Sequence, residues 1–259
     1  MTARRAAGSR REVGSVARAI ALLDALAESE AGVGVNELAR RIGVNASTAS
    51  RLLATLEQGG LVERAPGGPY RLGLKLVALS DRVLSRLDVR ERARPWLLTL
   101  VDETGETATL SVPGAGAAIT VDVVPAPSSV VSMARLGRPS VSHATAAGKV
   151  MLAFGGDAAL SRGTELTAYT ERTITDPDAL VRELAVVRER GIAEAVGERE
   201  PDLAAMAAPV LGRGDELVAI LGVQGPVGRL PAAKRRALEQ PLRRAAAEVG
   251  RLLGGTGAT

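Results

Sequence analysis

The chain of 259 residues contains no Cys and one His, and its 33 basic and 29 acidic side chains give a formal net charge of +4. The lack of Cys excludes disulfides, thiolate zinc sites and a cysteine nucleophile, and a single His argues against a histidine-based triad or metal centre. No apolar run approaches the ~18 residues that a membrane-spanning helix requires, and 46% hydrophobic residues suffice for a packed core. We expect a soluble, cytoplasmic protein that uses no metal or cofactor and no membrane partner.

The excess positive charge lies at the N-terminal end of the chain. Residues 1–75 hold 11 Lys/Arg and 7 Asp/Glu, so the remainder is neutral overall. A basic unit joined to a neutral body is typical of a nucleic-acid-binding module fused to another domain. Residues 1–14 carry several arginines among small residues and are expected to form a flexible basic arm. This arm either contacts phosphates or only keeps the chain soluble.

The pattern of residues 15–73 predicts a winged helix-turn-helix. Apolar residues recur at helical spacing after Ser15, a candidate N-cap. This first helix has an expected inward set of Val16, Ile20, Leu23 and Ala27. The elements that follow are a short helix at 36–41, a helix capped by Asn45 that runs to about residue 58, and two short strands at 61–64 and 70–72. Three helices and a hairpin in about 60 residues are the composition of this fold.

Residues 74–89 predict one amphipathic linker helix that contains neither Gly nor Pro and is therefore stiff. Residues 90–255 mix helices and strands in an α+β pattern. The expected elements are a helix at 96–102 started by Pro95, strands at 107–112, 118–124 and 130–135, helices at 146–154 and 177–190, strands at 203–211 and 217–224, and a helix at 231–253 that Pro241 kinks or splits. Asp176 and Gly191 are expected to cap the helix at 177–190.

The third helix is the candidate DNA reader. In a helix-turn-helix the N-terminal residues of the second helix of the motif enter the major groove. Small hydroxyl side chains there permit close approach to the duplex, and Arg51 is long enough to reach a guanine edge or a phosphate. The residues assigned to DNA binding on this helix and on the wing are Asn45, Ser47, Thr48, Ser50, Arg51, Arg64 and Arg71. The alternative is that the hydroxyls only initiate the helix and the arginines are solvated surface charges.

Several motifs together resemble the IclR (isocitrate lyase regulator) family of transcription factors. They are ELARRIGVNASTASRLLATLEQGGLVERAPGGPYRLG at 37–73, HATAAGKVMLAF at 143–154, TITDPDALVRELAVVRERGIA at 173–193 and AAMAAPVLGRGDELVAILGVQGP at 204–226. The resemblance runs from about Ser15 to Leu253. It implies a winged helix-turn-helix, a linker helix and a GAF/PAS-like effector domain with a mainly antiparallel sheet. It also implies homodimers, or dimers of dimers, on double-stranded operator DNA, and a small-molecule effector.

The resemblance also assigns an effector site. At positions where the family often has a Cys and two hydroxyl residues, this chain has Ala205, Gly222 and Gln224, and an acidic position becomes Ala195. The residues assigned to effector binding are Ala146, Gly148, Ala205, Gly222 and Gln224. Such a lining offers volume but few hydrogen-bond donors, so we expect an effector that is larger or less polar than a two- or three-carbon acid. Its anionic group, if present, would meet the N–H groups that start the helix at 146. The alternative is that these small residues only pack the sheet.

Two more residues near this site receive structural interpretations. His143 is expected to make a hydrogen bond without a catalytic role, and Lys149 to be a solvated helix charge. Carboxylates at Glu198, Glu200 and Asp202 follow no catalytic spacing. The sequence therefore indicates a ligand-responsive, sequence-specific transcriptional regulator that is not an enzyme. The alternative is a nonspecific architectural DNA-binding protein.

Overall fold

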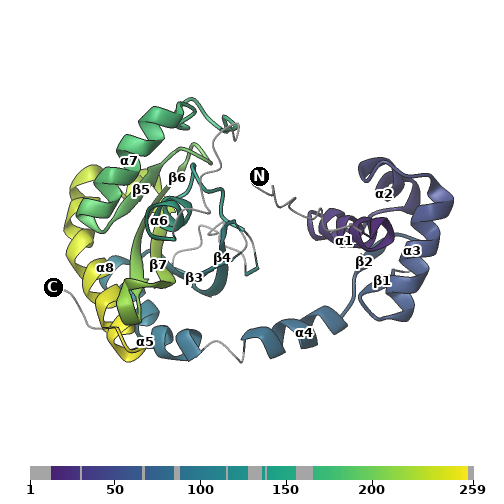
Figure 1. The fold of residues 1–259 in the computed structure, drawn as a ribbon, viewed down its shortest axis with the longest axis horizontal. Coiled ribbons are helices and arrows are strands. Elements are labelled where there is room, and N and C mark those ends of the chain that lie inside the picture. Colours follow the sequence, from purple (N-terminus) through teal and green to yellow (C-terminus); the bar gives the residue numbers. More distant parts are fainter. Residues whose placement is uncertain are drawn as a thin grey trace, which may run out of the picture. The chain divides into compact units, whose positions relative to one another are not determined.

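A computed structural model describes residues 13–29, 31–65, 68–84, 88–114, 116–127, 136, 137, 139–155 and 166–255. The chain forms two compact units, Met1–Arg86 and Leu87–Thr259 (Figure 1). In the described parts of both units, no helix is long and apolar enough to cross a bilayer. Most of the predicted basic arm lies outside the described residues.

The N-terminal unit is three helices and a two-stranded hairpin, followed by a fourth helix. Its elements are α1 (Gly14–Ala27), α2 (Val35–Arg41), α3 (Ala46–Gln58), β1 (Val62–Arg64), β2 (Tyr70–Leu72) and α4 (Lys75–Leu84). A core that includes Leu22, Leu38 and Leu53 joins the three helices to the hairpin. The winged helix-turn-helix arrangement that the sequence predicts is therefore present.

The inward face predicted for α1 is wrong. The buried residues are Leu22, Ala25 and Leu26, whereas Val16 is 56% exposed and Ile20 is 54% exposed. Apolar residues occupy more than one face of this helix, so spacing alone does not decide which face packs against α3. Ser15 is not the cap either, because the helix already begins at Gly14 and no side chain caps it.

The C-terminal unit is built on a five-stranded antiparallel sheet in the order β4-β3-β7-β6-β5. Its strands are β3 (Thr107–Pro113), β4 (Ala118–Val124), β5 (Ala193–Val196), β6 (Leu203–Leu211) and β7 (Leu217–Pro226). Its helices are α5 (Asp88–Thr104), α6 (Ala146–Phe154), α7 (Pro177–Arg190) and α8 (Ala232–Leu252), with short 3₁₀ turns η2 (Arg213–Asp215) and η3 (Val227–Arg229). The α+β class with an antiparallel sheet, predicted from the sequence, is confirmed.

Helices α5, α6 and α8 pack directly on the sheet. Helices α5 and α8 pack on each other and on the strands, and α8 is the yellow helix in Figure 1. Helix α6 packs on β5, β6, β7 and α7. Because strand side chains alternate, residues such as Ala207 and Ile220 face α6, in one core with Val150 and Leu184. The cavity described below lies on this α6 face.

Several element boundaries differ from the prediction. Helix α5 begins at Asp88 and contains Pro95, and α8 runs through Pro241 without being split, because the buried faces of both helices continue past the proline. The short edge strand β5 was not predicted. The strand expected at 130–135 lies outside the described residues. The linker helix expected at 74–89 overlaps α4 and the start of α5, and residues 85–87 lie outside the described residues.

Candidate DNA-binding surface and effector pocket

The start of α3 is fixed by its cap. The Oδ1 atom of Asn45 accepts a hydrogen bond from the Thr48 N–H at 2.8 Å, which satisfies one of the N–H groups that a helix leaves free at its first turn. On the inner face Ala49, Leu53 and Leu56 are buried. That burial turns the other side of the helix outward, and Asn45, Ser47, Ser50 and Arg51 are exposed while Thr48 is half-buried.

The wing holds the two other predicted arginines, and both are exposed. The Arg71 Nε atom pairs with Glu63 Oε1 at 2.6 Å across the β1–β2 register. The guanidinium of Arg64 lies 5.6 Å from the centre of the Tyr70 ring. An exposed ion pair contributes little free energy, about 0–1 kcal/mol, so a phosphate can displace Glu63 from Arg71. Contact of these residues with DNA stays a prediction.

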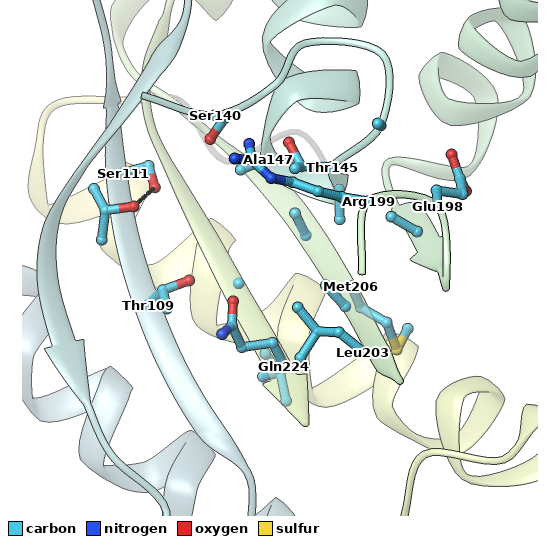
Figure 2. A pocket seen from close by; sticks show the side chains of 18 of the residues that line it. Thr109, Ser111, Ser140, Thr145, Ala147, Glu198, Arg199, Leu203, Met206 and Gln224 are labelled. Carbon is cyan, nitrogen blue, oxygen red and sulfur yellow. Dashed lines mark hydrogen bonds between the residues drawn. The ribbon is translucent and has the colours of Figure 1, made fainter. Parts of the chain in front are cut away.

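A cavity of about 110 Å³ lies between the sheet and the N-terminal end of α6. Its floor follows from strand register: Gly222 of β7 lies opposite Thr109 of β3 on one side and opposite Ala207 of β6 on the other. Residues directly opposite in neighbouring strands share a face of the sheet. Figure 2 shows Thr109, Gln224 and Met206 on the strands that form this floor, with Thr145 and Ala147 on the opposite side.

Four of the five predicted effector residues line this cavity together, namely Ala146, Ala205, Gly222 and Gln224. Gly148 does not. A Cβ at Gly148 would lie 2.5 Å from the Val141 carbonyl oxygen, so the glycine allows the segment before α6 to pack against the helix. Binding of an effector by these residues stays a prediction.

The cavity holds more hydroxyl and charged side chains than the sequence argument expected. Five hydroxyl side chains line it: Thr109, Ser111, Thr120, Ser140 and Thr145. Three charged side chains of the β5–β6 turn also line it: Glu198, Arg199 and Glu200. The expectation of few donors is therefore wrong. A signal was present in the sequence, because β3 alternates Thr107, Thr109 and Ser111 with apolar residues, the period of a strand with one polar face.

A hydroxyl from the neighbouring strand occupies the space beside Gly222. A Cβ at Gly222 would lie 2.6 Å from the Oγ1 atom of Thr109. The absence of a side chain on β7 thus makes room for a hydroxyl from β3. Alignment along β7 alone does not reveal this hydroxyl, because it belongs to β3.

Lys149 is buried, and the prediction of a solvated charge is wrong. The residue is 1% exposed, and its Nζ atom donates to Glu198 Oε1 at 2.7 Å and to the Glu194 carbonyl at 2.9 Å. Glu183 of α7 is a third partner at 3.3 Å. Burial raises the pKa of Glu198 above its ordinary value, an effect that attraction to Lys149 opposes only in part. The ion pair fixes the β5–β6 turn against α6.

His143 has the structural role that the sequence predicts. Its Nε2 atom lies 2.9 Å from the carbonyl oxygen of Thr167, and its ring lies 6.0 Å from that of Tyr169. Thr173 supports the same region, since its hydroxyl donates to the Glu198 carbonyl at 2.6 Å. The β5–β6 turn is thus held from two sides, by Lys149 of α6 and by the segment around Thr173.

Comparison with known families decides the identity. Residues 15–66 match the IclR helix-turn-helix domain, and residues 81–251 match the C-terminal domain of the bacterial transcriptional regulator IclR. The chain belongs to the IclR family. Its N-terminal unit is therefore the DNA-binding domain of a transcriptional regulator, as the motif resemblance implied.

Two related regulatory proteins match over nearly their whole length. The transcriptional regulator XynR of Escherichia coli is 31% identical over 244 residues, which cover 93% of this chain and 97% of XynR. The glycerol operon regulatory protein of Streptomyces griseus is 34% identical over 249 residues, which cover 94% of this chain and 98% of that protein.

Solved IclR-family structures share the fold. A regulator from Alicyclobacillus acidocaldarius has a TM-score of 0.79 and 30% identity, and covers 94% of this chain and 100% of its own. An IclR homologue from Microbacterium hydrocarbonoxydans, solved in complex with 4-hydroxybenzoate, has a TM-score of 0.77 and 25% identity, with 92% and 98% coverage.

Proposed function

We propose that this IclR-family member is a ligand-responsive, sequence-specific regulator whose C-terminal pocket binds a small organic effector. The observation that carries the proposal is the cavity itself. Hydroxyl and charged side chains from β3, β4, the segment before α6 and the β5–β6 turn converge on one space beside the start of a helix. A pocket with a few convergent polar groups is the usual form of a small-molecule site.

The size of the cavity limits the effector. An engineered protein cavity of about 150 Å³ accommodates benzene, and this cavity is about 110 Å³. We propose an effector with one ring or less. The 4-hydroxybenzoate held by the Microbacterium homologue has one ring, one hydroxyl and one carboxylate, and this supports the same class of ligand here. The effector would act through its different affinity for two protein conformations, typically a coupling of about 1–3 kcal/mol.

We also propose that the active species is a homodimer, alone or paired as a dimer of dimers. Val13, which precedes α1, and Val16 and Ile20 of α1 recur at i, i+3 and i+7 and are all more than half exposed. An apolar stripe of this kind suits a second copy of the chain. Dimerisation would place two α3 helices one turn of DNA apart on a near-palindromic operator. Sedimentation of the wild type and of Ile20→Glu tests this, since a dimer held by the stripe should dissociate in the variant.

Fluorescence anisotropy with the DNA upstream of its own gene tests sequence-specific binding, with excess unrelated DNA as competitor and no effector present. Arg51→Ala should weaken binding by about 1–3 kcal/mol if Arg51 contacts a base. Arg213→Ala, which removes an exposed arginine from η2, is the matched control and should change little. The same competition is repeated with DNA fragments selected from the genome for binding. If the competitor abolishes binding to the upstream DNA and to these fragments alike, the nonspecific architectural alternative is favoured.

A further inference from the structure

The edge strand β4 contains a β-bulge that separates two polar residues. Ser111 of β3 pairs with Thr120, whereas the preceding residue, Leu110, pairs with Asp122. The extra residue on β4 is Val121. Residues two apart in a regular strand share a face of the sheet. Here Thr120 and Asp122 lie on opposite faces, because each shares the face of its partner on β3.

We infer that this bulge couples the effector pocket to the start of α5, with Asp122 as the positioning residue. The inference rests on the proposed effector function, because it concerns how occupation of the pocket reaches the rest of the chain. It requires a polar group on the pocket side of the bulge, a partner on the α5 side and a reason why the two sides move together.

The pocket side of the bulge is Thr120. Its side chain lines the cavity, and its Oγ1 atom lies 3.4 Å from Ser111 Oγ, the hydrogen bond drawn at Ser111 in Figure 2. Strand β4 is at the edge of the sheet, with β3 as its neighbour. A ligand that takes over the hydrogen bond of Thr120 therefore acts on an edge strand at its unpaired residue, where a backbone shift breaks few ladder hydrogen bonds.

The other side of the bulge is an incompletely bonded carboxylate. Asp122 is buried, and its Oδ1 atom accepts hydrogen bonds from Arg94 Nη1 at 2.5 Å and from the Val123 N–H at 2.9 Å. Its Oδ2 atom has no hydrogen-bond partner among the described residues, and Arg90 Nε lies 3.7 Å away. A buried acceptor without a hydrogen bond is costly. A closer arrangement, with Arg90 at about 2.9 Å, would satisfy it.

The two arginines belong to the first two turns of α5. Arg90 and Arg94 are four residues apart and so lie on one side of the helix. Helix α5 begins at Asp88, two residues after the N-terminal unit ends at Arg86. A change in the position of Asp122 thus acts on the segment through which the effector unit continues, in sequence, into the DNA-binding unit.

The chain distance between the two sides makes them move together. Val121 alone separates Thr120 from Asp122, so a backbone shift at the bulge changes the position of both. The open and closed arrangements of Arg90 with Asp122 are then the two states between which a ligand selects. A ligand shifts this equilibrium only if its contacts with Thr120 differ between the two states.

Hydrogen exchange of the full-length protein, without effector or DNA, tests the coupling. The amides of residues 92–94 bond back to the first turn of α5 and report its opening. Thr120→Val removes the hydroxyl on the pocket side of the bulge and keeps the shape of the side chain. Thr109→Val, which removes a cavity hydroxyl from β3 outside the bulge, is the matched control. Asp122→Asn keeps the side-chain shape and removes the charge that holds the arginines.

Exchange at residues 92–94 should rise about 3- to 10-fold in Thr120→Val, the effect of one lost hydrogen bond, and stay at the wild-type rate in Thr109→Val. These amides should exchange faster in Asp122→Asn, and adding Thr120→Val should change nothing further. Arg94→Met breaks the same contact from an exposed side chain and should show the same pattern, which decides the question if Asp122→Asn does not fold. Unchanged exchange in Thr120→Val, an equal rise in Thr109→Val, or an undiminished effect of Thr120→Val in both the Asp122→Asn and Arg94→Met backgrounds would overturn the inference.

DNA provides the reciprocal test, because a coupling free energy between two sites acts equally in both directions. DNA fragments selected from the genome for binding should change exchange at residues 119–123 by at least about twofold in the wild type and not in Asp122→Asn. If such DNA binds without this effect, the coupling does not reach the DNA-binding unit and the inference fails. If no DNA fragment binds, the proposed regulatory function fails instead, and the comparison of variants without DNA still decides the coupling.

Discussion

Replacing Lys149 with Met should destabilise the C-terminal unit by about 3–5 kcal/mol, the usual cost of removing one partner from a buried ion pair. Lys149 is 1% exposed and Glu198 is 11% exposed, so the variant leaves a carboxylate with little access to water. The Oε2 atom of Glu198 already has no hydrogen-bond partner among the described residues. Met keeps the unbranched apolar stem, so the loss reports the charge and not a large cavity.

The assay is urea unfolding followed by the fluorescence of Trp96. This is the only Trp in the chain, and it belongs to α5, so the signal reports the C-terminal unit. The double variant Lys149→Met with Glu198→Gln removes both charges and should recover most of the lost free energy of unfolding. The single variant Glu198→Gln completes the cycle.

The pH dependence gives a second readout of the same pair. Burial raises the folded-state pKa of Glu198 above its unfolded value, so between these two values the folded state binds more protons. The free energy of unfolding of Lys149→Met should therefore rise as pH falls through this window, and it should not do so in the double variant. A loss below about 1 kcal/mol in Lys149→Met, or a double variant that loses the sum of both singles, would refute the argument that a buried charge pair holds the turn.

Four further outcomes follow from the structure. Asn45→Ala removes the side-chain cap of α3 and should lower the free energy of unfolding of the N-terminal unit by about 1 kcal/mol. The measurement is thermal unfolding followed by far-UV circular dichroism, in which Asn45→Ser should recover most of the lost stability. Gly222→Ser places an atom 2.6 Å from Thr109 Oγ1 and should weaken effector binding in calorimetry, with recovery when Thr109→Ala is added. Burial alone would raise the pKa of Glu194, but hydrogen bonds from arginines of α7 and α8 outweigh burial, so the pKa is lowered. The free energy of unfolding that is lost in Glu194→Gln should therefore be largest at neutral pH and should vanish as the pH falls through this lowered pKa. If six phosphates are neutralised, operator affinity should fall with salt at a log–log slope of about −5, and a slope near zero would exclude this phosphate-contacting surface.

Local signals predicted α3, the candidate recognition helix, well. Asn45 precedes α3, and Ala49, Leu53 and Leu56 follow at helical spacing, so a single stretch of sequence contains both the cap and the inward face. Helix α1 gave a wrong face because its apolar residues occur all around the helix, and only the packing of Leu22 against other elements selects one. Spacing identifies a helix more readily than it identifies the partner of that helix.

The lining of the candidate effector pocket was predicted only in part, for a related reason. The positions of Ala205, Gly222 and Gln224 followed from motifs and strand parity. The hydroxyls of β3 and the burial of Lys149 depend on which strands and helices become neighbours, which residue spacing does not specify. The pairing of β3 with β7 is a contact between residues more than a hundred positions apart.

The relation between Gly222 and Thr109 has a consequence for how effector preference diverges among related regulators. A hydroxyl in this space can be carried by either of two adjacent strands, provided that the opposing position is small. The chemical identity of the pocket is then a property of residue pairs across the sheet, and a column of aligned residues read singly would classify this pocket as hydroxyl-poor. Two regulators with different residues at both positions could present the same functional group to the same ligand.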